Sequence, residues 1–121
     1  MHSDKNMIYI VDDDESVCRA IKCLLVTFGF DVKTFNSSDN FFSALPNNAK
    51  GCLILDIHMP GLDGLQTLKR IIKSGSKLSV IIITADINSR AKEDAIKAGA
   101  IGFLQKPFND QVLVDLINLA F

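Results

Sequence analysis

The chain has 121 residues, of which 48% are hydrophobic and 22% are charged, so it is long enough for one domain with a core and too apolar for a disordered segment. Its 13 Lys and Arg residues stand against 14 Asp and Glu residues, and the formal net charge of -1 argues against direct contact with nucleic acid. No apolar run has the length of a membrane span, and neither a signal peptide nor an anchor is expected from the first residues.

Short apolar runs alternate with longer amphipathic stretches, a pattern typical of βαβ units around a parallel sheet. Five strands are predicted, at residues 7–11, 31–35, 51–55, 79–83 and 101–104. The first, third and fourth runs are continuously apolar, as interior strands are, whereas the second alternates apolar with polar residues. The second strand is therefore predicted to lie at an edge.

Amphipathic patterns predict one helix after each strand. The apolar face of the first helix ends with Phe28 and that of the third with Ile72, while the fourth helix, at about residues 89–98, is rich in alanine. The last helix has Asn109 or Asp110 as its cap. Its predicted buried face consists of Val112, Leu113, Leu116, Ile117 and Ala120. Right-handed crossovers between the strands then give a doubly wound sheet with helices on both faces.

Polar side chains follow four of the predicted strands where each strand ends. Asp12 and Asp13 follow the first strand, Asp56 the third, Thr84 the fourth and Lys106 the fifth. Ligands of doubly wound sheets bind beyond the carboxyl ends of the strands. We therefore expect these side chains to converge on one rim of the sheet.

The chemistry of this set suits phosphoryl transfer at a metal site. Carboxylates in contact repel one another unless a hard cation lies between them, and oxygen ligands of this kind suit Mg²⁺. Asp56 can attack phosphorus as a nucleophile, while Lys106 and the Thr84 hydroxyl can stabilise charge on the phosphoryl oxygens. Asp14 and Glu15 are expected only to begin the first helix. Each of the other residues, taken alone, has a plainer interpretation as a turn, strand-end or surface residue. The combination of these other residues at four strand ends favours a shared site.

Four segments resemble the receiver domain of two-component response regulators, in order and over essentially the whole chain. They are residues 8–17, 53–64, 81–85 and 98–108, which read IYIVDDDESV, LILDIHMPGLDG, IIITA and AGAIGFLQKPF. The resemblance implies a CheY-like, flavodoxin-like α/β fold with strand order 2-1-3-4-5 and five flanking helices. Residues 1–121 then form one receiver domain, which we expect to be part of a longer regulator.

The resemblance also implies a metal site for Mg²⁺, in which Mn²⁺ can substitute. Asp13 and Asp56 ligate the ion directly, Asp12 acts through water, and the backbone carbonyl of His58 supplies a further ligand. Asp56 is in addition the phosphoacceptor, and Lys106 binds the phosphoryl group.

The implied protein is a signalling switch and not an ordinary enzyme, although it assists its own phosphorylation and dephosphorylation. A sensor histidine kinase donates the phosphoryl group, Thr84 moves toward it, Phe103 turns inward, and the surface of the fourth helix and fifth strand changes its binding preference. The opening and closing motifs most resemble the FixJ/LuxR-type subgroup, which implies control of transcription through a separate DNA-binding domain and a homodimer on phosphorylation.

The compartment expected from the sequence is the cytoplasm. The 3 cysteines contain no C-x-x-C pair, and such a set fits a reducing environment. Neither a membrane nor a direct nucleic acid contact is expected for this domain.

Other interpretations stay open beside the receiver. The segment DIHMPG at residues 56–61 matches the D-x-H-x-x-G pattern of cobalamin-binding domains, although the Gly-Gly pair of that family is absent, and a stand-alone receiver would act by protein contact alone. A phosphatase of the haloacid dehalogenase kind would need a second Asp in place of His58. His58 and Asp86 border the site, so the lifetime of the phosphorylated state stays open.

Overall fold

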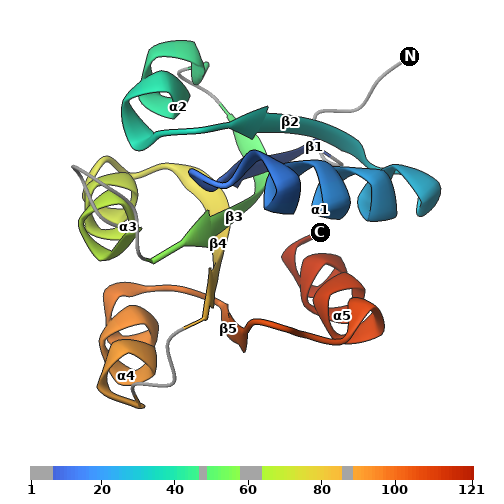
Figure 1. The fold of residues 1–121 in the computed structure, drawn as a ribbon. Coiled ribbons are helices and arrows are strands. Elements are labelled where there is room, and N and C mark those ends of the chain that lie inside the picture. The colour runs from blue at the N-terminus through green and yellow to red at the C-terminus, as the bar shows by residue number, and fades with distance from the viewer. Residues whose placement is uncertain (1–6, 47–48, 58–63, 86–88) are drawn as a thin grey trace.

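Strands and helices alternate along the chain in the computed structural model, which describes residues 7–46, 49–57, 64–85 and 89–121 (Figure 1). The strands are β1 Met7–Val11, β2 Asp31–Phe35, β3 Lys50–Asp56, β4 Lys77–Thr84 and β5 Gly102–Gln105. The helices are α1 Glu15–Thr27, α2 Ser38–Ala44, α3 Gly64–Lys73, α4 Ser89–Ala98 and α5 Asp110–Ala120.

The strands form one parallel sheet in the order β2-β1-β3-β4-β5. The predicted fold class and strand order are confirmed, with β3 and β4 longer at both ends than predicted and β5 one residue later. The apolar runs of β1, β3 and β4 are interior, whereas β2 has no fully buried residue, as expected of an edge strand with one neighbour.

Helices cover both faces of the sheet. Helices α1 and α5 lie on one face, and α2, α3 and α4 on the other (Figure 1). Leu25 and Ile117 belong to the core on the first face, and Phe41, Leu68 and Ile71 to the core on the second. Each strand in the middle of the sheet contributes alternate side chains to both cores.

Side-chain caps begin three of the helices. The Asp14 carboxylate accepts hydrogen bonds from the backbone N–H groups of Ser16 and Val17, so Asp14 begins α1 as predicted. Ser37 caps α2 and Asn109 caps α5 in the same way. No helix in the described part of the chain combines the length and apolarity that crossing a membrane requires.

The faces of three helices differ from the prediction. Val112 is 45% exposed, and Val114 is buried in its place, because the face of α5 that packs on the sheet is the one that carries Leu113, Val114 and Ile117. Phe28 is 49% exposed because it is the C-cap of α1, past the last helical residue, where helical spacing no longer applies. Ile72 is 43% exposed and lies beside Gly99 at the end of α4 instead of facing the sheet.

Gly51, the second residue of β3, has a backbone that only glycine adopts readily. Its φ is +122°, and a Cβ placed there would overlap the carbonyl oxygen of Met7 on the neighbouring strand. Gly29, after α1, also has a positive φ, of +89°, but a Cβ there would meet nothing within 4 Å. A side chain at Gly29 would therefore cause backbone strain alone, whereas a side chain at Gly51 would cause both backbone strain and steric overlap.

We expect Gly51→Ala to lower the free energy of unfolding clearly more than Gly29→Ala does. Strain alone costs about 1 to 3 kcal/mol, and at Gly51 the strand pair must also separate to admit the methyl group. Urea unfolding of the two variants measures the difference. An equal loss of unfolding free energy in both variants would show that the close approach of β1 and β3 at Gly51 does not contribute to stability.

Candidate functional site

Three carboxylates meet at the carboxyl ends of β1 and β3. The side chains of Asp12, Asp13 and Asp56 each offer an oxygen, and these oxygens lie within 4.8 Å of one another. Asp12 is fully buried, Asp56 is 7% exposed, and Asp13 is exposed to solvent. Two carboxylates of the cluster are therefore buried in the protein, and the third, that of Asp13, faces solvent.

Lys106, directly after β5, joins two of these acids. Its Nζ donates to Asp12 Oδ2 at 2.8 Å and to Asp56 Oδ2 at 3.4 Å. Burial acts to lower the pKa of Lys106, but the hydrogen bonds and charges of the two acids outweigh it, so the net pKa is raised. The ammonium group therefore stays charged between the carboxylates.

Asp12 is held in place by the backbone around it. Its Oδ1 accepts from the backbone N–H of Asp14 at 2.9 Å, and its own N–H donates to the carbonyl of Phe35 at 3.1 Å. Because Oδ2 is engaged by Lys106, both oxygens have donors. Asp12 is thus suited to orient neighbours and is less available as a nucleophile than Asp56.

Thr84 and Phe103 lie on the strands beside the acid cluster. Thr84 is fully buried at the end of β4, one residue beyond Ile83, which pairs with Asp56. The carbonyl of Thr84 accepts from the backbone N–H of Lys106 at 2.7 Å, so the end of β4 is joined directly to the residue that carries the cation. Phe103, in β5, is partly buried against the core that α2, α3 and α4 cover.

Two residues named from the sequence lie outside the described residues. These are His58, whose carbonyl is an expected metal ligand, and Asp86, which follows β4. Of the expected site residues the structure therefore places Asp12, Asp13, Asp56, Thr84, Lys106 and Phe103.

The donor set of the cluster fits a hard divalent cation. It consists of carboxylate oxygens, with no sulfur or imidazole among them, and Mg²⁺ prefers oxygen ligands from one or two carboxylates and water. One ammonium group does not balance three carboxylates. An additional positive charge on the open side would relieve the remaining repulsion.

Gly64, the first residue of α3, supports Asp56 in a way that sequence reasoning missed. Its N–H donates to the carbonyl of Ile57 at 2.9 Å, and a Cβ on Gly64 would overlap the Asp56 carbonyl oxygen and the Ile57 Cα. The absence of a side chain thus lets α3 begin against the strand end that carries Asp56. The only sequence signal was the position of Gly64 at the end of the segment 53–64.

Cys18 is a second neighbour that sequence reasoning missed. Its Sγ donates to the backbone carbonyl of Asp12 at 3.3 Å. Burial raises the pKa of this thiol to about 11, so the group stays protonated and can donate. No pattern in the sequence points to this contact, because it depends on how α1 packs on β1.

Comparison with known proteins gives a consistent result. The response regulator receiver domain family matches residues 8–118. The chain is 38% identical over 116 residues to the transcriptional regulatory protein FixJ of Bradyrhizobium diazoefficiens, covering 96% of this chain and 57% of that protein. It is also 38% identical over 120 residues to the response regulator protein TmoT of Ectopseudomonas mendocina, covering 99% of this chain and 54% of that protein.

Solved structures agree with the sequence relatives. A crystal structure of FixJ-N superposes with a TM-score of 0.89 at 32% identity, covering 99% of this chain and 94% of the other. Full-length FixJ from B. japonicum superposes with a TM-score of 0.88 at 37% identity, covering 98% of this chain and 58% of the other. The chain spans about half the length of the curated relatives that it matches.

The acid cluster predicts a specific response to Mg²⁺. We expect Mg²⁺ to raise the melting temperature of the protein, and Asp13→Asn to weaken this binding by about tenfold or more, because one ligand and one charge are lost. Without Mg²⁺, the same variant should melt higher than the parent, since carboxylate repulsion is relieved. Thermal unfolding at a series of Mg²⁺ concentrations measures both effects.

Glu15→Gln is the matched control for this experiment. Glu15 belongs to the same acidic run but lies in the first turn of α1, outside the cluster. Its variant should bind Mg²⁺ as the parent does. If both variants lost the same Mg²⁺ affinity, the ion would be attracted only by the negative charge of the acidic run and not bound at the cluster.

Proposed function

Because the chain belongs to the response regulator receiver domain family, we propose that it is the phosphorylation switch of a two-component system, with Asp56 as its phosphoacceptor. We further propose that residues 1–121 act as the receiver part of a longer regulator. Support for the second proposal comes from relatives that are about twice as long as the chain.

The observation that carries the proposal is the position of Lys106 against Asp56. In the transfer step an Asp56 carboxylate oxygen forms a bond to phosphorus as the bond from phosphorus to the donor nitrogen of a kinase histidine breaks, and the imidazole leaves with the electron pair. The Lys106 ammonium, 3.4 Å from Asp56 Oδ2, is placed to attract the incoming phosphoryl oxygens. The buried Thr84 lies beside the same strand end and is proposed to donate its hydroxyl to one of them.

Asp12, Asp13 and Asp56 are the residues that would hold Mg²⁺, or Mn²⁺ in its place. When bound, the ion neutralises charge on the phosphoryl oxygens. The open side of the cluster, where Asp13 is exposed, admits both the donor and the water that later hydrolyses the acyl phosphate. The protein is thus proposed to assist both its phosphorylation and its dephosphorylation.

Helix α4 is the element that we propose responds to phosphorylation. Among its described side chains only Ala95 is buried, whereas Ile96 is 46% exposed. Since hydrophobic stabilisation follows buried apolar area, at about 25 cal/mol per Å², a helix held by alanine is moved at low cost. A shift of Thr84 toward the phosphoryl group and of Phe103 inward would then change the surface of α4 and β5.

The partners proposed are a sensor histidine kinase and an output domain or downstream protein. Relatives are named as transcriptional regulators, which supports a transcriptional output located outside these residues. The exposed Ile96 on α4 supports a protein contact at the surface of α4 and β5, and a homodimer formed on phosphorylation is one such contact. The family match does not favour the cobalamin alternative.

The acceptor is tested with a small phosphodonor. Incubation with Mg²⁺ and acetyl phosphate should add one base-labile phosphoryl group to the parent and none to Asp56→Asn, as read by intact mass. Asp110→Asn, an exposed acid in the first turn of α5, is the control and should be phosphorylated normally. A parent that stays unmodified would refute the proposal.

Lys106→Ala should separate phosphorylation from signalling. The variant keeps its nucleophile and acid cluster, so acetyl phosphate should still modify it, but it loses the cation that links phosphoryl charge to the loop after β5. In the full regulator the output should therefore fail to respond to the kinase. A reporter of that output, compared with the measured level of phosphorylation, checks this, and a normal response would argue against coupling through Lys106.

A further inference from the structure

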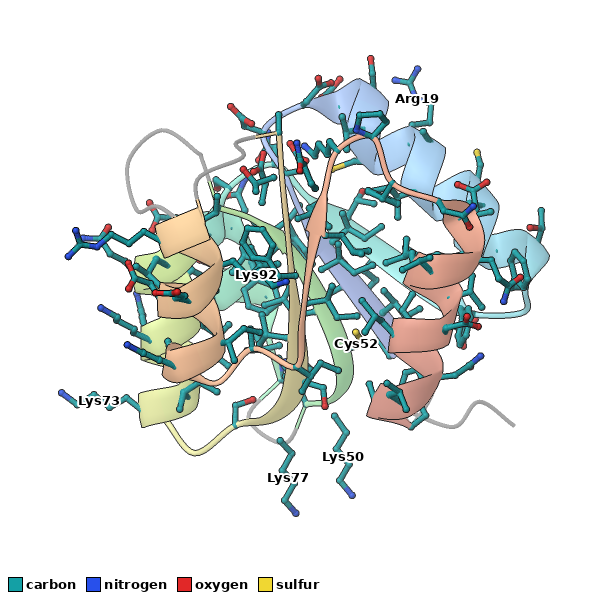
Figure 2. All side chains as sticks on the ribbon, turned by 90° about the horizontal axis from the view of Figure 1, so that it is seen from below. Arg19, Lys50, Cys52, Lys73, Lys77 and Lys92 are labelled. Carbon is teal, nitrogen blue, oxygen red and sulfur yellow. The ribbon has the colours of Figure 1, made fainter. Side chains whose placement is uncertain are left out.

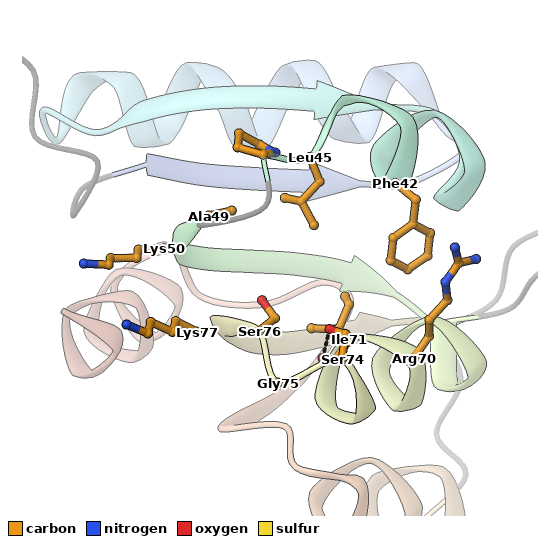
Figure 3. Close-up of a pocket in the computed structure, with 11 residues that line it drawn as sticks. Phe42, Leu45, Ala49, Lys50, Arg70, Ile71, Ser74, Gly75, Ser76 and Lys77 are labelled. Carbon is orange, nitrogen blue, oxygen red and sulfur yellow. Dashed lines mark hydrogen bonds between the residues drawn. The ribbon is translucent and has the colours of Figure 1, made fainter.

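A groove lies at the end of the sheet opposite the acid cluster. It runs between α2 and α3 from the amino ends of β3 and β4 to Phe42 and Arg70, and has a volume of about 730 Å³ (Figure 3). Lys50 begins β3 and Asp56 ends it, so the Lys50 end of the groove is about 20 Å from the acceptor at 3.3 Å per residue. It is therefore separate from the site described above.

The groove has an apolar floor and a cationic rim. Phe42, Leu45, Ala49 and Ile71 supply the floor, and Lys50, Arg70 and Lys77 supply the cations. Lys50 and Lys77 are paired across β3 and β4 and extend from the same end of the sheet (Figures 2 and 3). Arg70 lies toward the other end of the groove, beside Phe42 (Figure 3).

All charged side chains in the sequence segments around the groove are positive. Residues 41–55 and 64–85, which contain the lining residues, include Lys50, Lys69, Arg70, Lys73 and Lys77 but no Asp or Glu. Within the described residues, none of the three lining cations forms an ion pair. The net charge of -1 for the chain thus conceals a positive surface at this end.

Arg70 is held in a position that leaves its donors available. Its guanidinium carbon lies 4.0 Å from the centre of the Phe42 ring. The face of the ring attracts the cation, and the N–H groups of a guanidinium can bind a carboxylate or phosphate in bidentate fashion. The Ser76 hydroxyl accepts from the N–H of Leu78 at 3.2 Å and so keeps its own proton for an anion.

We propose that this groove binds a small organic anion with a flat apolar body and a dianionic phosphate-like or dicarboxylate head. The volume falls within the range of small-molecule sites, about 300 to 1,000 Å³. The body would pack on Phe42 and Ile71, and the head would be held by Arg70 or by Lys50 and Lys77. The proposal does not depend on phosphorylation of Asp56.

The probe is phenylphosphonate, which joins a ring to a dianion and, through its P–C bond, cannot act as a phosphodonor. It is titrated into the ¹⁵N-labelled, unphosphorylated chain in EDTA and followed by amide chemical shifts. We expect saturable shifts at Ala49, Lys50 and the turn from Ser74 to Lys77. Asp56→Asn should bind the probe as the parent does, which keeps this test independent of the acceptor.

Arg70→Gln and Lys77→Gln are each expected to weaken binding by about tenfold, the loss of one charge-assisted contact. Two variants are used because Arg70→Gln also removes the contact with Phe42. Lys69→Gln is the matched control: Lys69 is exposed on α3 next to Arg70 but does not line the groove. Its variant should bind within twofold of the parent.

Two further ligands separate charge from shape. Inorganic phosphate has the head without the body, and benzamide has the ring without the charge, so each should bind at least about tenfold more weakly than phenylphosphonate if both parts are recognised. A dicarboxylate, phenylsuccinate, distinguishes the two head groups, and binding by either supports the site. Absence of saturable shifts with both phenylphosphonate and phenylsuccinate at millimolar concentration, equal affinity for inorganic phosphate, or an equal loss in Lys69→Gln would overturn the proposal.

Discussion

The site of this protein depends on one cation among three carboxylates, at the end of the sheet where the carboxyl ends of the strands lie. Lys106 reaches Asp12 from 94 positions away in the chain, and with Asp56 it ties together the ends of β1, β3 and β5. Without this ammonium group the buried Asp12 would lack a charged partner, which is costly in a low-dielectric interior. With it, the cluster still carries excess negative charge on its open side, and that excess suits the site to a divalent cation.

The two ends of the sheet have opposite electrostatic character, although the chain as a whole is almost neutral. Acids gather where the strands end, and cations gather where β3 and β4 begin. The charges come from the residues at the strand ends, and the parallel sheet groups them because all of its carboxyl ends lie on one side and all of its amino ends on the other. This separation of charge underlies both proposals: a metal with a phosphoryl group at the carboxyl ends of the strands, and an organic anion at their amino ends.

The elements and the main site residues could be predicted because their signals are local. Continuous apolar runs marked β1, β3 and β4 as interior strands, and alternation marked β2 as an edge, since burial on one face or two determines which positions must be apolar. Asp12, Asp56, Thr84 and Lys106 were predicted to meet because each follows a strand, and the geometry of a parallel sheet then brings strand ends together. Four motifs at these positions were also enough to indicate the family, which the comparisons confirm.

The positions of the strands, and which of them are interior, were thus determined by the sequence itself through hydrophobic periodicity, whereas the full strand order was implied by the resemblance to the family. The tertiary structure alone decided which face each helix buries, as Val114 in place of Val112 shows, because an apolar stripe can be wider than the contact it makes. It also decided that Lys106 lies closer to Asp12 than to Asp56, that Gly64 must be small to fit against the Asp56 backbone, and that Arg70 stacks on Phe42 over a cationic groove. The contacts of Lys106 with Asp12 and of Arg70 with Phe42 join residues far apart in the chain, and their distances are set by how the layers pack and not by any local pattern.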